Sequence, residues 1–299
     1  MSDNLEMDFL SDQAQRSLIA LGYSDWISCL DQLVEKSLEE YGLELIKPLA
    51  GGRAGTVIQV SSDKEIRVLK LSPPDITPGQ ANALRALGGK PFPKLLDSNH
   101  LDGSILMEYI PSEPCPERAP LDLDQGARIV RFFEERPLEN YFGTHLEQLT
   151  RWLDSQIKES PGPTMLGRIA LAKRLMDEAP SDNYRHIHGD LGNYNLIEDK
   201  NREIWAVDPL GIQGPAAYDA ASFIVHSGFN SKEISGKIGE IAELLELQPL
   251  ETARWAAVRS TALAMNSHNC EEWLRYRYYN DVADTLVREF KLPAHCSRC

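Results

Sequence analysis

Three polar side chains in the second half of the chain have residue types and a spacing that suit phosphoryl transfer. An apolar segment ends in the turn His188-Gly189-Asp190, four residues separate Asp190 from Asn195, and a later apolar segment runs into Asp208. A carboxylate such as that of Asp190 could accept the proton of an attacking hydroxyl. The amide of Asn195 and the carboxylate of Asp208 offer the hard oxygen ligands that Mg²⁺ prefers.

The segments around these residues predict a β-hairpin that would bring Asn195 and Asp208 together. Short apolar stretches flank the polar run at residues 199–202, which is typical of two strands joined by a turn. With the turn centred between Asn201 and Arg202, Asn195 would lie opposite Asp208, with Cβ atoms about 5 Å apart. We therefore expect a metal site at the open end of this hairpin.

The spacing of His188, Asp190 and Asn195 is that of the kinase catalytic loop, in which the aspartate is the base and the asparagine a metal ligand. The alternative is structural: Asp190 and Asn195 would cap a turn, and Asp208 would open the turn at residues 209–211. The apolar segment before the pattern, the predicted hairpin and the second aspartate at its end favour the catalytic interpretation.

These residues and the segment after them resemble the aminoglycoside phosphotransferase family, which has a protein-kinase-like fold. The likeness is carried by His188-Gly189-Asp190, Asn195, Val207-Asp208-Pro209-Leu210-Gly211 and Gly214-Pro215-Ala216-Ala217-Tyr218-Asp219. The run Asp-Pro-x-Gly-x-x-Gly-x-x-x-Tyr-Asp is most similar to the streptomycin 6-kinase and hydroxyurea phosphotransferase branch. The likeness extends roughly from Leu43 to the C-terminus and is sharp from His188 to Asp219.

The resemblance implies a role for each matching residue and two cofactors, ATP and Mg²⁺. Asp190 is expected to be the catalytic base, and Asn195 and Asp208 are expected to bind Mg²⁺. His188 and Asp219 are expected to support the catalytic loop without contacting the substrate.

Short apolar segments between residues 43 and 110 predict a five-stranded antiparallel sheet that binds the nucleotide. In the turn that contains Gly51, Gly52, Arg53 and Gly55, main-chain N–H groups could approach phosphates because glycine has no Cβ. A glycine-rich hairpin without a ligand is the alternative. On the third strand, the buried ammonium of Lys70 would require an anion, which the α- and β-phosphates supply. The alternative for Lys70 is an edge-strand lysine in solvent.

Two further features complete the predicted nucleotide site. In the family, the helix after the third strand carries a glutamate that pairs with the strand lysine, and this sequence has Gln80 there. Because an amide cannot neutralise an ammonium, we expect the difference to affect turnover more than nucleotide binding. In kinase-like folds the last strand leads to the hinge, so main-chain atoms of Glu108 and Ile110 are expected to bind the adenine.

The fold is therefore expected to be α+β and two-lobed, with a sheet-containing N-terminal lobe and a mainly helical C-terminal lobe. The predicted domains are a helical extension at 1–42, a nucleotide-binding lobe at 43–111 and a catalytic and substrate-binding lobe at 112–299. The helices of the extension would either pack on the first lobe or present a surface to a partner.

Composition limits the partners of this chain. Its 299 residues carry 31 basic and 45 acidic side chains, a net charge of −14, which argues against nucleic acid and is compatible with a cationic acceptor. The sequence contains no membrane-length apolar run, and its polar start is no signal peptide. Five scattered cysteines suit a reducing, cytoplasmic environment better than a disulfide framework. Cys296 and Cys299 could hold zinc only with a second half-site, so a frayed tail is favoured.

The sequence leaves the acceptor open, beyond a hydroxyl on a small molecule. A streptomycin-like substrate carries guanidinium groups and requires carboxylates, for which Glu271, Glu272 and the acids at 134–135 are candidates. A related metabolite is an equal candidate. A nucleotide-binding pseudokinase scaffold is a second hypothesis, favoured by Gln80 and the helical extension. A protein kinase is disfavoured, because the stretch between Asp208 and Asp219 has no room for an activation segment.

Overall fold

The computed structural model describes residues 8–49, 54–112, 122–134, 143–155, 163–178 and 184–293. The chain forms two compact units, one of residues 1–112 with 199–205 and the other of residues 113–198 with 206–299. Residues 199–205 are the tip of a hairpin whose remaining residues belong to the second unit.

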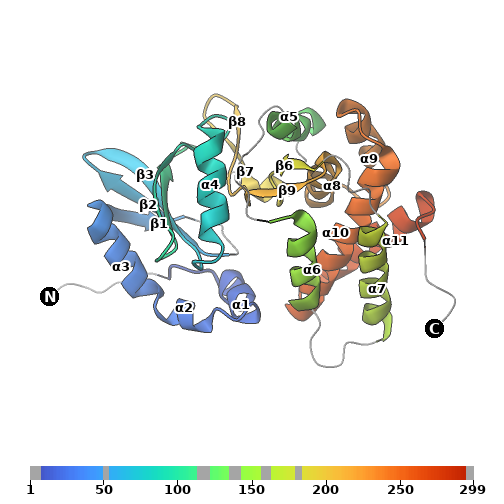
Figure 1. The fold of residues 1–299 in the computed structure, drawn as a ribbon, viewed down its shortest axis with the longest axis horizontal. Helices are drawn as coiled ribbons and strands as arrows, with labels where there is room; N and C mark the ends of the chain where they lie inside the picture. Colours follow the sequence, from blue (N-terminus) through green and yellow to red (C-terminus); the bar gives the residue numbers. More distant parts are fainter. Residues whose placement is uncertain are drawn as a thin grey trace. The chain divides into compact units, whose positions relative to one another are not determined.

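A five-stranded antiparallel sheet with the order β1-β2-β3-β5-β4 is the centre of the first unit, as the sequence predicts (Figure 1). Short apolar stretches form its strands, and one helix, α4, lies between β3 and β4 in the chain and ends at Gly88 in the left-handed conformation. The elements are β1 (Glu44–Pro48), β2 (Thr56–Ser62), β3 (Glu65–Leu71), α4 (Thr77–Leu87), β4 (Leu95–Asn99) and β5 (Ser104–Glu108).

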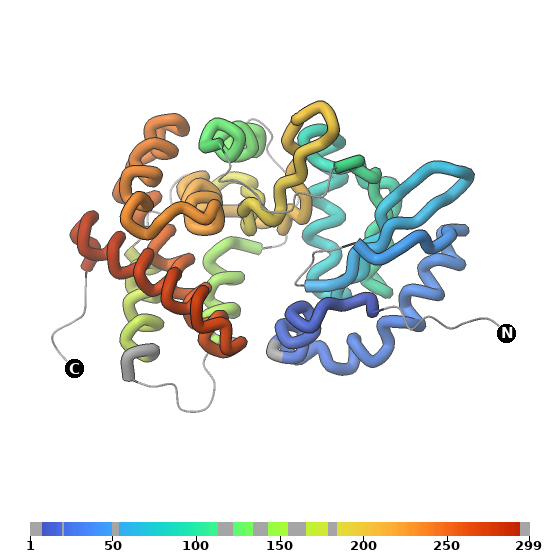
Figure 2. Tube along the Cα trace, turned by 180° about the vertical axis from the view of Figure 1, so that it is seen from behind, coloured from blue at the N-terminus to red at the C-terminus, as the bar shows by residue number. Residues whose placement is uncertain are grey.

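The N-terminal helices α1 (Asp12–Ala20), α2 (Ser24–Ser28) and α3 (Leu30–Tyr41) pack against this sheet. Their apolar residues form one core with residues of β2, β3 and β5, and Figure 2 shows the three helices, in blue, running along the strands. The core residues are Leu18, Trp26, Leu30, Val34, Leu43, Ile58, Val60, Leu69, Leu71 and Leu106. Of the two interpretations of residues 1–42, the structure therefore favours packing on the first lobe.

The second unit is mainly helical, and α10 is its central helix. α10 packs against α7, α8, α9 and α11, and Figure 2 shows α11, in red, lying along it. The helices are α5 (Leu123–Glu134), α6 (His145–Ser155), α7 (Pro163–Asp177), α8 (Ala216–His226), α9 (Ile234–Leu244), α10 (Pro249–Asn269) and α11 (Trp273–Glu289). Within the described residues, no helix combines the length and apolarity needed to cross a bilayer.

Short strands and a 3₁₀ turn between α7 and α8 carry the residues that the sequence singles out. β6 pairs with β9 in an antiparallel ladder, and β7 pairs with β8 to form the predicted hairpin. The elements are β6 (Arg185–Ile187), η1 (Asn193–Asn195), β7 (Leu196–Glu198), β8 (Ile204–Ala206) and β9 (Ile212–Gly214).

The register of the hairpin differs by one residue from the prediction. The N–H of Asp199 bonds to the Glu203 carbonyl at 2.9 Å, and the N–H of Val207 bonds to the Asn195 carbonyl at 2.8 Å. Asn195 therefore faces Val207, and not Asp208. The cause is a three-residue loop whose last residue, Arg202, has a φ of +64°, a left-handed conformation that adds a residue to the turn.

Candidate active site

Gly189 determines how the chain leaves β6 and presents Asp190. Its φ is +85°, and a Cβ at this position would lie 2.6 Å from Cδ1 of Ile212, the residue that pairs with Ile187 across the β6–β9 ladder. Any larger residue would be both strained and in collision with β9. The glycine in the His-Gly-Asp turn is therefore a geometric requirement.

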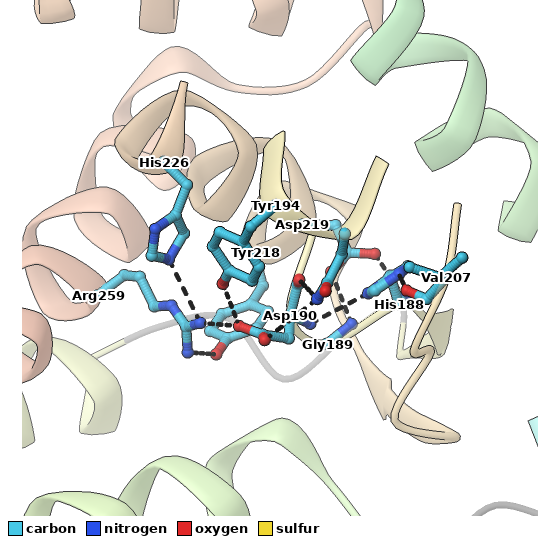
Figure 3. A network of polar contacts seen from close by, with 10 residues as sticks. His188, Gly189, Asp190, Tyr194, Val207, Tyr218, Asp219, His226 and Arg259 are labelled. Atoms are coloured by element: carbon cyan, nitrogen blue, oxygen red, sulfur yellow. Dashed lines mark hydrogen bonds and ion pairs between the residues drawn. The ribbon is translucent and has the colours of Figure 1, made fainter. Parts of the chain in front are cut away.

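Asp219 holds this turn from the first turn of α8. Its Oδ2 accepts the N–H of His188 at 2.6 Å and its Oδ1 accepts the N–H of Gly189 at 2.9 Å (Figure 3). The side chain is fully buried, and two main-chain donors satisfy it. Asp219 thus fixes the main chain immediately before Asp190.

The imidazole of His188 connects the Asp190 turn to the end of the hairpin. Its Nε2 lies 2.9 Å from the Val207 carbonyl, and its Nδ1 lies 3.3 Å from the N–H of Asp190. Because a carbonyl only accepts, Nε2 carries the proton and Nδ1 accepts from Asp190. Burial lowers the pKa of His188, which keeps the ring in this neutral tautomer.

The two oxygens of the Asp190 carboxylate have different surroundings. Oδ1 accepts the hydroxyl of Tyr194 at 2.7 Å and forms an ion pair with the guanidinium of Arg259. Oδ2 accepts only a longer contact of 3.3 Å from Nδ2 of Asn195, among the described residues. The Asp190 side chain is 31% exposed. Oδ2 therefore has lone-pair capacity left for an incoming hydroxyl.

Asn195 is oriented by Asp190. Its Nδ2 donates to the Asp190 carbonyl at 2.9 Å as well as to Oδ2. Both partners are acceptors, so the nitrogen must lie on this side and the amide oxygen on the other. The oxygen is thereby left to serve as a metal ligand.

Asp208 follows the hairpin with a φ of +60°. This left-handed conformation is uncommon for a residue with a side chain, although aspartate and asparagine tolerate it best. It redirects the chain toward the turn at residues 209–211, in which the N–H of Leu210 bonds to the His188 carbonyl at 2.8 Å. The charges of Asp190 and Asp208 both oppose the lowering of the His188 pKa by burial.

The sequence reasoning did not identify Arg259, on α10, as part of this site. Its guanidinium donates to the Tyr218 hydroxyl at 3.2 Å and pairs with Asp190 (Figure 3). The signal was an arginine within the alanine-rich residues 252–265, most of which α10 buries, because a buried cation requires an anionic partner. The sequence alone does not say which of many carboxylates that partner is.

Asp219 gives the site a dependence on pH. Burial raises its pKa to about 7, against the opposing effect of the two N–H bonds, from an ordinary value of 3.8. Between these values the folded protein holds a proton that the unfolded chain has lost, so this group's contribution to the free energy of unfolding falls as pH rises from about 4 to 7. We expect the D219N variant to lack this decline. Urea unfolding of both proteins across this range measures it, and parallel curves would show that Asp219 titrates normally.

In the first unit, Lys70 lies on the inner strand β3 and is 2% exposed. It is opposite Val57 of β2 and Ile105 of β5. The alternative of an edge-strand lysine in solvent is therefore wrong. A buried ammonium at this position is suited to an anionic ligand.

Gln80 is buried in α4, and its side-chain oxygen has no hydrogen-bond partner among the described residues. Lys70 therefore does not donate to it. A buried carbonyl without a donor is costly, and its presence in the helix that follows the strand lysine is consistent with the weaker pairing expected from the sequence.

The remaining predicted nucleotide contacts are only partly described. A Cβ on Gly55 would lie 2.1 Å from the Leu71 carbonyl, so this glycine is required by close packing on β3. The N–H of Glu108 is donated to the Lys94 carbonyl at 3.0 Å, which leaves its carbonyl and the main chain of the buried Ile110 as candidates for the adenine. Gly51, Gly52 and Arg53 lie outside the described residues.

The carboxylates suggested for a cationic acceptor are not gathered at Asp190 by any described contact. Glu272 pairs with Arg275 at 3.3 Å within the α11 region, and Glu271 is an exposed residue in the turn before it. Residue 135, the side chain at 134 and the terminal cysteines lie outside the described part. Among the described residues, no group of three His, Cys, Asp or Glu side chains could hold a metal by itself.

Comparison with solved structures identifies the fold. Choline kinase LicA from Streptococcus pneumoniae matches with a TM-score of 0.60 and 17% identity, over 87% of this chain and 99% of that chain. Aminoglycoside phosphotransferase APH(4)-Ia matches with a TM-score of 0.62 and 14% identity, over 86% and 98%. A choline/ethanolamine kinase family protein from Mesorhizobium loti gives 0.53 and 14%, over 83% and 86%.

At these identities the likeness shows the fold, an α+β arrangement shared with small-molecule kinases. No family model matches the sequence, and no curated protein matches it.

Proposed function

We propose that this protein is an ATP-dependent phosphotransferase that acts on a hydroxyl of a small molecule. The observation that carries the proposal is the environment of Asp190. One carboxylate oxygen is held by Tyr194 and Arg259, the other accepts a longer contact from Asn195, and the amide oxygen of Asn195 lies on the side away from Asp190. This arrangement, on a fold shared with small-molecule kinases, suits a base beside a metal ligand.

In the proposed reaction, Oδ2 of Asp190 accepts the proton of the acceptor hydroxyl as its oxygen attacks the γ-phosphorus of ATP. The new oxygen–phosphorus bond forms while the bond from the γ-phosphorus to the β,γ-bridging oxygen breaks. The leaving ADP keeps the electron pair, and the phosphorylated product leaves its proton on Asp190. Most of the acceleration comes from placement and charge neutralisation.

The residues present fit a magnesium ion. The amide oxygen of Asn195 and the carboxylate of Asp208 are the hard oxygen donors that Mg²⁺ prefers, and phosphate oxygens and water complete its shell in kinase sites. The absence of a closed cluster of three ligating side chains among the described residues agrees with such an open site. The ion would neutralise charge on the phosphates.

For the nucleotide, we propose that Lys70 binds the phosphates and that the turn from Gly51 to Gly55 approaches them through main-chain N–H groups. Main-chain atoms of Glu108 and Ile110 are the proposed adenine contacts. Residues 43–111 would thus bind ATP, and residues 112–299 would carry catalysis. Structures of APH(4)-Ia with ADP or AMP-PNP support nucleotide binding by this fold.

The proposed acceptor is an aminoglycoside, as in the streptomycin-kinase-like branch that the sequence resembles, or a related metabolite. APH(4)-Ia binds hygromycin B, whereas other structural neighbours are choline kinases. Beside Asp190 the described groups are the guanidinium of Arg259 and the ring of Tyr194. The Asp190 carboxylate balances the Arg259 charge, so a cationic acceptor is not repelled there. A cytoplasmic location completes the proposal.

The test is ATP consumption by the purified protein with Mg²⁺ across a panel of streptomycin, hygromycin B, choline and neutral sugars. Turnover that depends on one acceptor, with a phosphorylated product found by mass spectrometry, supports the proposal. Thermal stabilisation by Mg·ATP without turnover on any acceptor would favour the pseudokinase scaffold instead.

Replacing Gln80 with glutamate is expected to raise kcat by about tenfold, because a carboxylate would neutralise and hold the Lys70 ammonium. The KM for ATP should change less, since the phosphates already provide an anion. Steady-state kinetics measure both constants. The exposed Gln15 of α1 offers the matched control, Q15E. An unchanged or lower kcat in Q80E would show that the helix residue does not limit turnover.

A further inference from the structure

Arg259 makes its polar contacts through the two terminal nitrogens of its guanidinium, whereas its buried Nε has no hydrogen-bond partner among the described residues. It donates to Oδ1 of Asp190 and to the Tyr218 hydroxyl at 3.2 Å, and one nitrogen lies 3.5 Å from Nε2 of His226. Its central carbon lies 5.2 Å from the ring centroid of Trp152. Figure 3 shows Arg259 and His226 on one side of Asp190, with His188 and Asp219 on the other.

Arg259 is a buried residue, and its pairing with Asp190 is not a surface ion pair. The Arg259 side chain is 9% exposed, whereas that of Asp190 is 31% exposed. α10 is buried along residues 255–265, so the guanidinium cannot move into solvent without disturbing the helix packing. Because a guanidinium only donates, Nε2 of His226 must be its acceptor, which fixes that ring as well.

We infer that Arg259 is a positioning residue, which acts on the acceptor hydroxyl through Asp190. The inference rests on the proposed function, since it requires Asp190 to be the base. Arg259 and Tyr194 both occupy Oδ1, and this fixes the rotation of the carboxylate. Oδ2 is thereby directed at the acceptor.

The geometry requires the planar fork of arginine. One nitrogen reaches Asp190 while another reaches Tyr218, and the central carbon lies over the Trp152 ring. A lysine ammonium is a point charge that cannot reproduce two separated contacts and a stacked face. If Arg259 were only a buried cation needed for folding, its replacement would change stability but not the chemical step specifically.

The experiment compares R259K and R259A with the wild type, using Mg·ATP and the panel compound that gives the highest turnover. We expect kcat to fall about 10²-fold in R259A, because a displaced base loses alignment, and less in R259K. The KM for ATP should stay near the wild-type value. Millimolar guanidinium should restore part of the turnover in R259A by filling the vacated position. The control is R254A, which removes another arginine of the same helix. The described hydrogen bond of Arg254 is to the Glu178 carbonyl.

A double-mutant cycle tests whether Arg259 acts through Asp190. In a D190N background the R259A change should lower the residual turnover less than threefold, as expected when two residues work as a unit. Melting temperatures of all variants show which are folded. If R259A does not fold, the cycle is measured with R259K. Turnover in R259A and R259K equal to that of R254A, or a full additional loss in D190N, would overturn the inference. A wild type without turnover on any acceptor would instead overturn the proposed function.

Discussion

The D190N variant is expected to lose roughly 10²- to 10⁴-fold in turnover, the range for removal of a positioned base, while Mg·ATP affinity stays close to wild type. Asparagine has nearly the same shape as aspartate but its amide cannot accept the acceptor's proton. The nucleotide contacts proposed for Lys70 and Asp208 do not involve this side chain. Steady-state kinetics and ATP titration measure the two effects separately.

The structure adds an effect on stability to this prediction. Asp190 is the ionic partner of the buried Arg259, so D190N leaves that cation without a carboxylate and should lower the melting temperature. An asparagine carbonyl still accepts a hydrogen bond, which makes D190N gentler than D190A. D284N is the matched control, because it removes an exposed carboxylate that pairs with Arg168. Wild-type turnover in folded D190N would show that Asp190 is not the base.

The D208A variant is expected to abolish productive metal binding and therefore turnover. Asp208 supplies the carboxylate of the proposed magnesium pair, and the amide of Asn195 is neutral and cannot balance the ion's charge. The measurement is thermal stabilisation by ATP with and without Mg²⁺. In the wild type, bound Mg·ATP raises the melting temperature by mass action, and in D208A the Mg²⁺-dependent part of this rise should disappear.

A companion variant separates this role from the turn that Asp208 opens. Alanine is strained at a φ of +60°, whereas asparagine tolerates the left-handed conformation. D208N should therefore keep the fold and still lose most Mg²⁺-dependent stabilisation. If both variants lower the melting temperature but respond to Mg·ATP as the wild type does, Asp208 only shapes the turn.

Local patterns in the sequence were sufficient for most of the architecture. Short apolar segments predicted the five-stranded sheet, whereas for the N-terminal helices the sequence left packing on the first lobe and a partner surface as alternatives. Of the two interpretations of Lys70, the structure shows the buried ammonium. These features depend on neighbours within a few residues, whose effects are present in the sequence itself.

The register of the hairpin was decided by a single backbone angle. Asn195 was expected opposite Asp208, but Arg202 adopts a positive φ and the register shifts by one residue. The sequence does not reveal which residue with a Cβ adopts the left-handed conformation. The conformation costs about 1–2 kcal/mol, and contacts elsewhere in the fold offset this cost.

The sequence by itself determined which groups could perform the chemistry, namely a base, an amide and a second carboxylate at fixed spacing. Only the tertiary structure decided how Asp190 is held. Arg259 reaches Asp190 across 69 residues of chain, and the buried charge of α10 could in principle have been matched by other carboxylates. Charge pairing acts through space and produces no periodic pattern along the chain. The partner of Arg259 therefore follows only from the packing of α10 beside the Asp190 turn.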